Sequence, residues 1–375
     1  MRRFPRYIHE LPGWPAFQWD RERLAGTLAA VRHRQGRLVG RMEALGFPLQ
    51  QEATLAALTE EAVKSSAIEG EQLEAQQVRS SLARRLGMDA AGVDVVDRRA
   101  EGVAEMMLDA TRNYDQPLTP DRLFGWHASL FPGGRSGMRK LRVGAWRDDS
   151  TGPMQVVSGP VGRERVHFEG PPAERLDREM SAFLSWFNAG TGLPVADDVL
   201  TAGLAHLWFV TIHPFDDGNG RIARAITDLA LARSERTAQR FYSMSAQIRR
   251  ERNDYYAILE RTQKGALDVT AWMEWFLDCF GRTIDGARET VAAVLRKARF
   301  WETLSGAPVN ERQHLMLNRL LDGFEGKLTT SKWAAIAKCS SDTALRDILA
   351  LVERGVLVRN PGAGRSTSYS LPEVR

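Results

Sequence analysis

The stretch that most limits how this chain can fold is Ala202 to Ile212 (AGLAHLWFVTI), which is almost wholly apolar. It is long enough for three turns of helix, so we expect a buried helix here. The next twelve residues, His213 to Arg224 (HPFDDGNGRIAR), are instead rich in charged and amide side chains. Pro214 predicts a turn or helix end at the junction. A buried segment must therefore come to the surface here and present a dense group of polar side chains.

The polar stretch has the composition of a phosphate-binding turn. Gly218 and Gly220 allow backbone dihedral angles that other residues avoid, so successive N–H groups can converge on an anion at the start of the next helix. Arg221 and Arg224 are three residues apart and share one face of that helix. Their planar guanidinium groups can each donate two parallel hydrogen bonds to phosphate oxygens. The pattern therefore indicates a site for a phosphorylated ligand.

Two further side chains indicate what chemistry such a ligand would meet. Asp217 is a hard oxygen ligand, and Mg²⁺ is commonly held by one or two carboxylates together with substrate phosphates. His213 is of the residue type whose ordinary pKa suits a general base near neutrality. Taken alone, DGNG is typical of a solvated turn, and a histidine after an apolar helix is typical of a capping residue. A calcium loop is excluded, because Arg221 and Ile222 fall where that loop needs an oxygen ligand and a glycine.

The twelve residues match the signature HPFx(D/E)GNGRxxR of the Fic family at every position, and on them the chain resembles that family. Most members resemble protein adenylyltransferases, which move AMP from ATP to a hydroxyl group of a target protein. The resemblance therefore implies an enzyme that uses ATP as substrate and Mg²⁺ as cofactor. Its acceptor would be a Ser, Thr or Tyr hydroxyl of a target protein or of the enzyme itself.

The same resemblance implies a role for each polar residue of the signature. His213 would be the general base that takes the proton of the target hydroxyl, and Asp217 would hold Mg²⁺. The phosphates would be bound by Gly218, Asn219, Gly220, Arg221 and Arg224. The three residues of the glycine turn would form an anion hole. The first arginine would contact the α- and β-phosphates, and the second the γ-phosphate.

A second motif lies far upstream, at Ser65 to Gly70 (SSAIEG). Ser65 and Glu69 are four residues apart and share a helical face, with Gly70 near a helix end. Such a pair is typical of a solvated helix face, but it also fits the (S/T)xxxE(G/N) inhibitory helix of many Fic proteins. The resemblance implies that Glu69 pairs with Arg224 and occupies the space that the γ-phosphate needs. It leaves open that Glu69 instead positions water to remove AMP from a modified target.

The composition is that of a globular protein with a sizeable core, since 43% of the 375 residues are hydrophobic and 26% are charged. The formal net charge of +4 allows a polyanionic partner without requiring one. Cys279 and Cys339 are isolated and have no metal-binding or redox spacing. The N-terminus has no apolar signal region, and no run approaches membrane-spanning length. We therefore expect an unprocessed cytoplasmic protein with no membrane association.

The helical and turn patterns predict a mainly α protein in three parts. Residues 1–94 form an N-terminal helical domain that carries the inhibitory motif, with Asp20 capping its first long helix and a linker at Ala90 to Asp94. Residues 95–299 form the catalytic core, a Fic-type helical core in terms of the resemblance. Residues 300–375 contain three short amphipathic stretches and a Gly-rich hairpin, which resemble a winged helix-turn-helix.

One part of the predicted core departs from the helical pattern. Two strand-like runs around Ser158 predict a β-hairpin spanning Val156 to Phe168. On helical proteins such hairpins are commonly surface features. In Fic proteins a hairpin at this place resembles a flap that pairs with the main chain of the target by strand addition. The resemblance thus implies a target-binding flap, in which we expect His167 to be an exposed strand residue rather than a catalyst.

The segment Asn253 to Gln263 (NDYYAILERTQ) resembles the part of the family that lines the adenine pocket. The resemblance implies that Tyr255 or Tyr256 lies against the base, and that Gln263 replaces an amide that many relatives carry. Paired tyrosines on a helix are also typical packing residues, so packing stays open as the alternative.

The C-terminal part leaves two classes of function open. From Val309 to Arg375 there are ten Lys and Arg against seven Asp and Glu, a net charge of +3, and the third helix offers chiefly Arg346 to a DNA groove. Such modules also act as dimer or domain-packing elements, and family members with this layout are often homodimers. The favoured hypothesis is an adenylyltransferase restrained by Glu69. The alternative is a DNA-binding transcriptional regulator whose Fic module senses nucleotide.

Overall fold

The computed structural model describes residues 6–88, 97–150, 152–160, 162–189, 197–304, 308–324, 326–361 and 367–372. The chain is mainly helical, as the sequence predicts, and divides into two compact units, Met1–Val291 and Ala292–Arg375. The first unit contains both the predicted N-terminal domain and nearly all of the predicted core. The predicted linker at 90–94 lies outside the described residues. The division into three domains stays a prediction.

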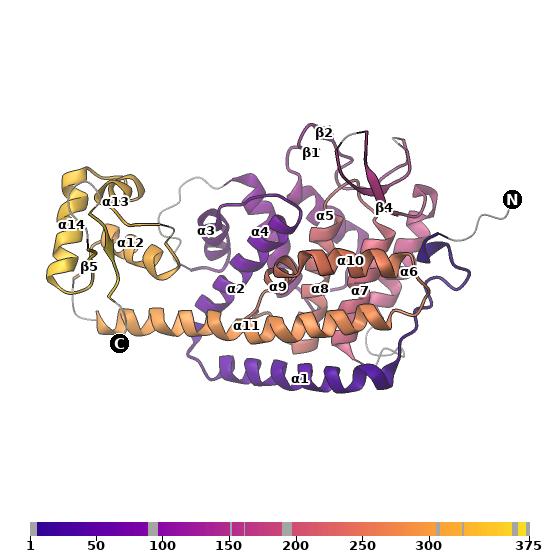
Figure 1. The fold of residues 1–375 in the computed structure, drawn as a ribbon, viewed down its shortest axis with the longest axis horizontal. Coiled ribbons are helices and arrows are strands. Elements are labelled where there is room, and N and C mark those ends of the chain that lie inside the picture. The colour runs from indigo at the N-terminus through magenta and orange to yellow at the C-terminus, as the bar shows by residue number, and fades with distance from the viewer. Residues whose placement is uncertain are drawn as a thin grey trace. The chain divides into compact units, whose positions relative to one another are not determined.

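Long helices and short connections build the first unit (Figure 1). They are α1 (Arg21–Glu43), α2 (Phe47–Ile68), α3 (Ala75–Arg85), α4 (Arg98–Arg112), α5 (Pro120–Leu130), α6 (Leu176–Asn188), α7 (Asp198–Ile212), α8 (Asn219–Glu235), α9 (Met244–Arg250), α10 (Arg252–Gln263) and α11 (Thr270–Thr303), with 3₁₀ turns η1 (Ile8–Glu10) and η2 (Ala173–Arg175). The α11 helix continues past the unit boundary. As predicted, Asp20 caps α1, because its side chain accepts a hydrogen bond from the backbone N–H of Arg23 at 3.0 Å.

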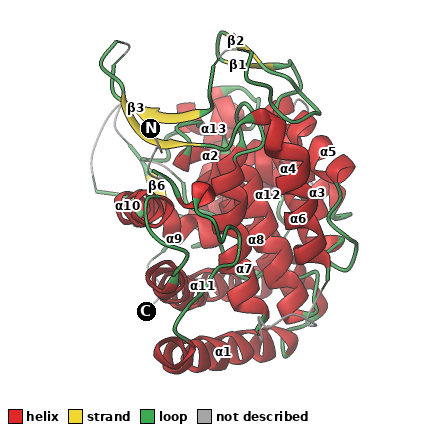
Figure 2. Cartoon of the chain, turned by 90° about the vertical axis from the view of Figure 1, so that its right-hand side faces the viewer, coloured by secondary structure: helices red, strands yellow, loops and turns green. Residues whose placement is uncertain are grey.

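The buried helix expected from the sequence is α7. Its residues from Ala202 to Ile212 are all buried, since α6 and α8 pack on it (Figure 2). Gly203 permits a close contact with α11, because a Cβ atom there would lie 2.8 Å from the ring of Phe276. The indole N–H of Trp272 donates to the Gly203 carbonyl at 2.8 Å. A helix that is buried along most of its length therefore carries the residues that follow it.

The α2 helix is also part of the core, although it comes early in the chain. It packs against α3, α4, α8 and α9. Its Glu61 is 2% exposed, and the carboxylate accepts hydrogen bonds from the Ser243 hydroxyl at 2.8 Å and the Ser245 backbone N–H at 2.9 Å. A buried carboxylate with these partners fixes α2 against α9. The C-terminal end of α2 is thereby held close to α8.

Two β-hairpins project on the same side of the first unit (Figure 2). The first pairs β1 (Arg135–Ser136) with β2 (Arg139–Lys140), and the second pairs β3 (Gln155–Ser158) with β4 (Arg165–Glu169), both antiparallel. In the second hairpin Val156 lies opposite Phe168, so the hairpin predicted between these residues is confirmed. Phe168 is buried under the rings of Tyr7 and His9, at centroid distances of 5.2 and 5.8 Å. The N-terminal segment thus anchors the β3–β4 hairpin.

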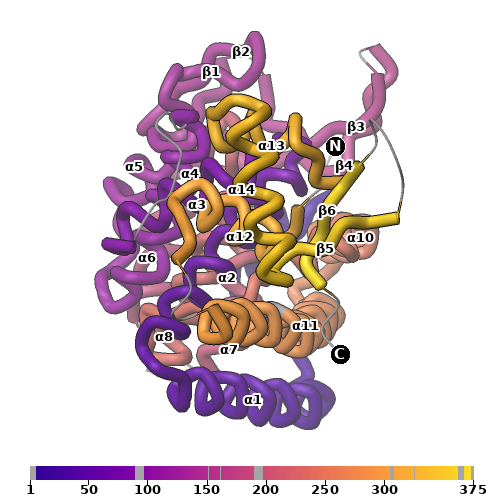
Figure 3. The backbone as a smooth tube through the Cα atoms, turned by 90° about the vertical axis from the view of Figure 1, so that its left-hand side faces the viewer, coloured from indigo at the N-terminus to yellow at the C-terminus, as the bar shows by residue number. Residues whose placement is uncertain are grey.

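The second unit has its own small core. It contains α12 (Glu311–Leu321), α13 (Thr330–Ile336) and α14 (Ser341–Glu353), followed by the antiparallel strands β5 (Val358–Arg359) and β6 (Tyr369–Ser370) (Figure 3). Met316, Trp333 and Ile348 are fully buried at its centre. The three helices and the hairpin occur in the predicted order, and the winged-helix assignment stays a prediction. Among the described helices of the whole chain, none is both long and apolar enough to cross a membrane.

Candidate active site

The α7 helix ends at His213, which adopts a left-handed conformation with φ 52° and ψ 58°. The helix stops here because Pro214 has no N–H to continue it. The ring Nδ1 of His213 lies 3.1 Å from the carbonyl oxygen of Val210. A carbonyl can only accept, so the proton of the neutral ring is on Nδ1. The other ring nitrogen, Nε2, therefore keeps its lone pair.

The surroundings of His213 favour this neutral form. Burial of the ring lowers the pKa of His213 to about 4, and the positive charge of Arg147 acts in the same direction. The hydrogen bond to Val210 and the carboxylates of Glu69 and Asp217 oppose this lowering of the pKa but do not overcome it. The imidazole is thus uncharged near neutral pH, and Nε2 can accept a proton.

The turn between α7 and α8 is closed by Asn219. Its Oδ1 accepts a hydrogen bond from the backbone N–H of Phe215 at 2.9 Å, and its Nδ2 donates to the Phe215 carbonyl at 2.7 Å. Gly218 is the N-cap of α8 and has φ 81°, and a Cβ atom there would lie 2.9 Å from the ring of Phe131. Only glycine suits that position. The Asn219 amide is thus used in shaping the turn, while the backbone N–H groups of the first turn of α8 form a positive helix end suited to an anion.

Both arginines of the signature are buried and meet residues from the end of α2. Arg224 is 2% exposed; its Nε donates to the Ser65 hydroxyl at 2.8 Å, and its Nη2 to the Ser65 carbonyl at 2.9 Å and to Glu69 Oε1 at 2.8 Å. Arg221 is 5% exposed, and its Nη1 donates to Glu71 Oε2 at 2.5 Å. The structure therefore brings together Ser65, Glu69 and Arg224, and it adds a second carboxylate that the motif does not contain.

Each of these guanidinium groups also has a nitrogen with no hydrogen-bond partner among the described residues. Arg221 Nε and Arg224 Nη1 are buried and form no hydrogen bond within the part of the chain that the structure describes. Glu69 lies against the same helix end, because a Cβ atom on Gly220 would be only 2.1 Å from its Oε1. A carboxylate thus occupies space beside the first turn of α8, next to donors that remain unsatisfied.

The backbone at the end of α2 explains how two carboxylates reach α8. The N–H of Glu71 bonds to the carbonyl of Ser66 at 3.0 Å, and the N–H of Gly70 bonds to that of Ala67 at 3.2 Å. With Gly70 at φ 84°, this is a Schellman cap. The cap places Glu69 and Glu71 on either side of a left-handed glycine, and each carboxylate pairs with one arginine.

Asp217 is the carboxylate that could hold a metal ion. Its Oδ1 accepts a hydrogen bond from the backbone N–H of Gly218 at 2.6 Å, and the residue is partly exposed. Among the described residues there is no group of three His, Cys, Asp or Glu side chains that could bind a metal without further ligands. One carboxylate beside an anion-binding helix end does fit Mg²⁺, which is commonly held by one or two carboxylates together with substrate phosphates and water.

The predicted adenine residues all lie on α10 but differ in their surroundings. Tyr255 is buried, and its hydroxyl is 2.8 Å from His206 Nε2. Tyr256 is half-buried, with the guanidinium of Arg252 4.9 Å from its ring centre. The Gln263 amide donates to the Thr211 hydroxyl at 3.3 Å, so it supports the end of α7. Of the three, Tyr256 is the residue whose ring is partly exposed.

Three residues of the site were missed in the sequence. The backbone of His213 is held by Arg147, whose Nε donates to the His213 carbonyl at 2.8 Å across 66 residues. Glu71 and Glu260 were the other two. Glu71 directly follows the inhibitory motif, and Glu260 lies within the Asn253–Gln263 segment, but neither was given a role there, and Arg147 belongs to no motif. Each of the three meets the site through a residue that is distant in the chain.

The β3–β4 hairpin is tied to α10 by Glu260. One carboxylate oxygen accepts from Arg165 at 3.0 Å and Lys264 at 2.6 Å, and the other lies 2.7 Å from His167 Nδ1. Hydrogen bonds from Lys264, His167 and Arg165 lower the pKa of Glu260 to about 2. His167 is therefore a partly buried anchor rather than the exposed residue expected from the sequence. Val157 of β3 is 48% exposed.

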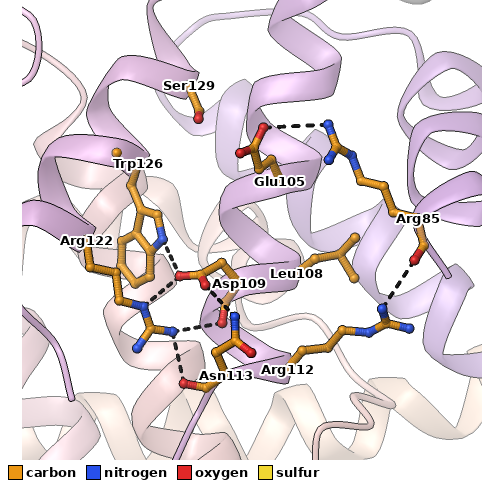
Figure 4. A pocket seen from close by; sticks show the side chains of 10 residues that line it. Arg85, Glu105, Leu108, Asp109, Arg112, Asn113, Arg122, Trp126 and Ser129 are labelled. Atoms are coloured by element: carbon orange, nitrogen blue, oxygen red, sulfur yellow. Dashed lines mark hydrogen bonds and ion pairs between the residues drawn. The ribbon is translucent and has the colours of Figure 1, made fainter. Parts of the chain in front are cut away.

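The first unit has two hollows that could accept a ligand. One of about 300 Å³ is at the base of the β3–β4 hairpin, and its lining includes Arg139, Met154 and Asp216. Another, of about 710 Å³, lies over α4 and α5 (Figure 4). There Arg122 and Trp126 both donate to Asp109 Oδ2, at 2.6 and 2.7 Å, so these polar groups are already paired. The smaller hollow is the one beside the signature.

Two family models match the chain. The Fic/DOC family matches residues 117–231, and a domain of unknown function, DUF4172, matches residues 7–88. These matches cover the His213 site and the α1–α3 region respectively.

Curated relatives align over about a third of the chain. The protein adenylyltransferase Fic of Culex quinquefasciatus is 32% identical over 133 residues, which is 35% of this chain and 25% of that protein. The protein of the same name from Nematostella vectensis is 34% identical over 116 residues, 31% of this chain and 25% of that protein. A uridine 5'-monophosphate transferase of Xanthomonas campestris pv. campestris is 32% identical over 127 residues, 31% of this chain and 21% of that protein. The aligned region thus spans a quarter or less of each relative.

Solved structures share the fold. A Fic family protein from Desulfovibrio desulfuricans has a TM-score of 0.51 at 21% identity, over 94% of this chain and 96% of that chain. A Fic domain-containing signaling protein from Bacteroides thetaiotaomicron also has a TM-score of 0.51, at 18% identity, over 70% of this chain and 97% of that chain. The helical architecture is therefore that of Fic proteins.

Proposed function

Because residues 117–231 of this chain form a Fic/DOC domain, we propose that the protein transfers AMP from ATP to a Ser, Thr or Tyr hydroxyl of a target protein or of itself. His213 Nε2 takes the proton of the hydroxyl. The hydroxyl oxygen forms a bond to the α-phosphorus, and the bond from that phosphorus to the oxygen bridging the β-phosphate breaks. Pyrophosphate leaves with the electron pair.

The observation that carries this proposal is the state of His213. A neutral imidazole with Nδ1 held by Val210 has its lone pair on Nε2, and it lies at the end of a rigid buried helix. A few residues later the N-terminus of α8 offers backbone N–H groups to an anion. A base and a phosphate site on consecutive helices suit transfer of a nucleotidyl group to a hydroxyl.

Asp217 would hold Mg²⁺, which when bound neutralises charge on the nucleotide phosphates. The phosphates themselves would be bound by the α8 helix end and by Arg221 and Arg224. Arg221 Nε and Arg224 Nη1, which have no partner within the described part of the chain, supply the additional donors. Charge-assisted hydrogen bonds from these groups orient the phosphates for attack.

We further propose that the protein is restrained by its own α2 end. Glu69 uses Arg224 and lies against Gly220, so a γ-phosphate would have to replace this carboxylate. Ser65 holds the same guanidinium through its hydroxyl and carbonyl, which keeps Arg224 oriented toward Glu69. In this state ATP meets a filled anion site.

The restraint includes Glu71 as a second carboxylate. Its ion pair with Arg221, at 2.5 Å, uses the arginine that would contact the α- and β-phosphates. Glu71 also lies 3.6 Å from Arg99. Both arginines of the signature are thus paired with carboxylates from one three-residue segment, so movement of that segment would remove both ion pairs at once.

The nucleotide base would lie near α10. Tyr256 is half-buried and stacks with Arg252, so its partly exposed ring could lie beside the base. Tyr255 and Gln263 instead make hydrogen bonds to residues of α7 and have a packing role. The base identity forms part of the test, because one relative is named a uridine 5'-monophosphate transferase. The target main chain would pair with the exposed edge of the β3–β4 hairpin.

The test is autolabelling with α-labelled ATP and Mg²⁺ of wild type, Glu69→Gly, and Glu69→Gly combined with His213→Ala. Strong labelling in the single variant alone supports both the transfer and the restraint. The same three proteins are then incubated with α-labelled UTP, CTP and GTP to establish the base. Absence of labelling with every nucleotide would contradict the transferase proposal and favour the nucleotide-sensing regulator.

The opposite direction of reaction has its own readout. If Glu69 positions water for AMP removal, wild type should release AMP from protein labelled by the Glu69→Gly variant, and Glu69→Gly should not. Retention of the label in the presence of wild type would exclude this alternative.

A further inference from the structure

A buried cation, Arg147, contacts the backbone of the turn that contains His213. Arg147 lies between β2 and β3, and its side chain is 1% exposed. Its backbone N–H donates to the carbonyl of Pro214 at 2.9 Å, and its Nε donates to the carbonyl of His213 at 2.8 Å. One residue thus binds both carbonyl groups at the turn where α7 ends.

The remaining nitrogens of Arg147 reach the two ends of the β3–β4 hairpin segment. Nη2 donates to the carbonyl of Pro171 at 2.5 Å, just after the hairpin. Nη1 pairs at 3.0 Å with Asp149, just before it. The other oxygen of Asp149 accepts from the backbone N–H of Ala173 at 2.7 Å. The guanidinium is therefore the point at which the His213 turn and the hairpin base are joined.

The conformation of His213 explains why such a clamp is needed. A residue other than glycine is strained in the left-handed region, and it keeps that conformation only where surrounding contacts hold it. Arg147 holds the backbone through the carbonyls of His213 and Pro214, while the carbonyl of Val210 holds the imidazole ring. A cation at the C-terminal end of α7 is also favoured by the helix dipole.

We propose that Arg147 is the positioning residue of the transfer reaction, joining the His213 turn to the base of the β3–β4 hairpin so that the general base and a target segment on the hairpin are aligned together. This inference rests on the proposed function. The planar fork of arginine is required, because three carbonyl and carboxylate partners are met at once in fixed directions. A lysine keeps the charge but cannot reach all three.

The experiment compares Arg147→Lys with its parent, Glu69→Gly, in which the site is open. At saturating ATP we expect the first-order autolabelling rate to fall about tenfold to hundredfold, because small misplacements of a reacting group have effects of this size. The dissociation constant for ATP should change less than about twofold, since Arg221, Arg224 and the α8 end are untouched. Arg142→Lys is the matched control: that side chain is half-exposed, pairs with Asp148 and should label at the parental rate.

A second readout needs no catalysis. In nitrogen-labelled protein, NMR of the His213 imidazole should show one neutral tautomer with Nδ1 protonated, and in Arg147→Lys a mixture of tautomers. The charged groups acting on this ring are Arg147, Glu69 and Asp217, so the spectra are compared with Glu69 absent from both proteins. Because this measurement is made without nucleotide, it tests whether Arg147 orients the His213 ring even if the protein transfers no nucleotide.

Chemical rescue separates positioning from general support of the fold. Guanidinium ion at non-denaturing concentration should restore part of the labelling rate of Arg147→Ala and leave the Arg142→Ala control unchanged. Parental labelling together with an unchanged His213 spectrum in Arg147→Lys would overturn the inference. Parallel loss of ATP affinity, melting temperature and labelling rate, without rescue, would also overturn it, since that is the result of a structural role alone.

Discussion

Single buried charges determine what the site can bind. Arg221 and Arg224 are nearly inaccessible, and each has one nitrogen with no hydrogen-bond partner in the described ranges. A buried donor left unpaired costs about 1–3 kcal/mol. A ligand that supplies phosphate oxygens to both groups would recover this energy, provided that it displaces Glu69 and Glu71.

The ionisation of His213 predicts a flat pH profile. Because burial lowers its pKa to about 4, the imidazole is in its base form throughout the range from pH 5 to 8. The labelling rate of Glu69→Gly should therefore vary less than about threefold between pH 5.5 and 8, whereas a histidine with the ordinary pKa near 6.5 would lose most of its base form by the lower limit. The rate is measured under kcat/KM conditions, which report the free enzyme. A fall of about tenfold between pH 8 and 5.5, which a pKa near 6.5 would give, would contradict the burial argument.

Replacing Glu71 tests the second carboxylate. Glu71→Gln keeps the size of the side chain but removes the charge that pairs with Arg221, so ATP should bind about fivefold to fiftyfold more tightly, a coupling of the usual size between competing ligands. Calorimetry provides the affinities. Glu74→Gln, a change at an exposed residue bonded to Gln77, serves as the control. Equal affinities for both variants would show that Glu71 does not compete with nucleotide.

Among the elements of the fold, the C-terminal end of α2 is the part that contacts the signature arginines. The helix is fixed by buried Glu61 and by four neighbouring helices, so we expect it to stay in place when the restraint is lifted. The Schellman cap after Ile68 is the part that can rearrange, since Glu69 and Glu71 are partly exposed. Movement of a few residues, rather than of a helix, would then control the site.

Gly70→Ala tests the cap. No atom of the described residues lies within 4 Å of the added methyl group, so its effect comes from the left-handed backbone at φ 84°. This strain should reduce the free energy of unfolding by about 1 kcal/mol. If the cap aligns both carboxylates, autolabelling should rise at the same time. Gly26→Ala, within α1 and also without close neighbours, should instead stabilise by up to about 1 kcal/mol. Urea titration gives both values, and lower stability without increased labelling would separate the cap from the restraint.

The hairpin anchor gives a test at the same scale. Glu260→Gln removes the charge that binds Arg165 and Lys264. Because a partly exposed ion pair contributes up to about 1 kcal/mol, amide hydrogen exchange in β3 and β4 should become up to about fivefold faster. Glu274→Gln, which breaks a comparable pair with Arg23 on another face, should leave the hairpin unchanged. Equal exchange in both variants would mean that Glu260 does not order the hairpin.

At the scale of the whole molecule, the second unit is the remaining question. Its α14 helix exposes Leu345 by 39% and Leu349 by 50%, four residues apart on one face. Helices that read a DNA groove use polar and basic side chains at such positions. This surface gives little support to the transcriptional-regulator alternative.

We therefore expect no binding of the full chain to duplex DNA at physiological salt. Fluorescence polarisation with a labelled duplex of mixed sequence, at low and physiological salt, measures this directly. Salt-dependent binding that is lost in Arg346→Ala but kept in Arg354→Ala would reverse the expectation and favour the regulator. Arg354 is a suitable control because its side chain donates to the carbonyl of Pro308.

Much of the site followed from short-range pattern. The apolar run predicted α7, Pro214 its end, the glycines the turn into α8, and the alternation around Ser158 the hairpin, because each depends on backbone preferences of neighbouring residues. The prediction that His167 is exposed was wrong, because its ring is partly buried against Glu260, which is 93 residues away in the chain. Arg147 could not be found for the same reason.

Short-range pattern was enough to predict the local geometry and the available side chains: an imidazole, two carboxylates, a glycine turn and two guanidinium groups lie within twelve residues. Tertiary structure alone decided which charges meet. Glu71 reaches Arg221 across 150 positions, and Arg147 reaches His213 across 66. Helix and turn formation is governed by neighbours in the chain, whereas the pairing of buried charges depends on how whole helices pack. That packing placed two carboxylates on the two arginines of the signature and one arginine on the backbone of the proposed base.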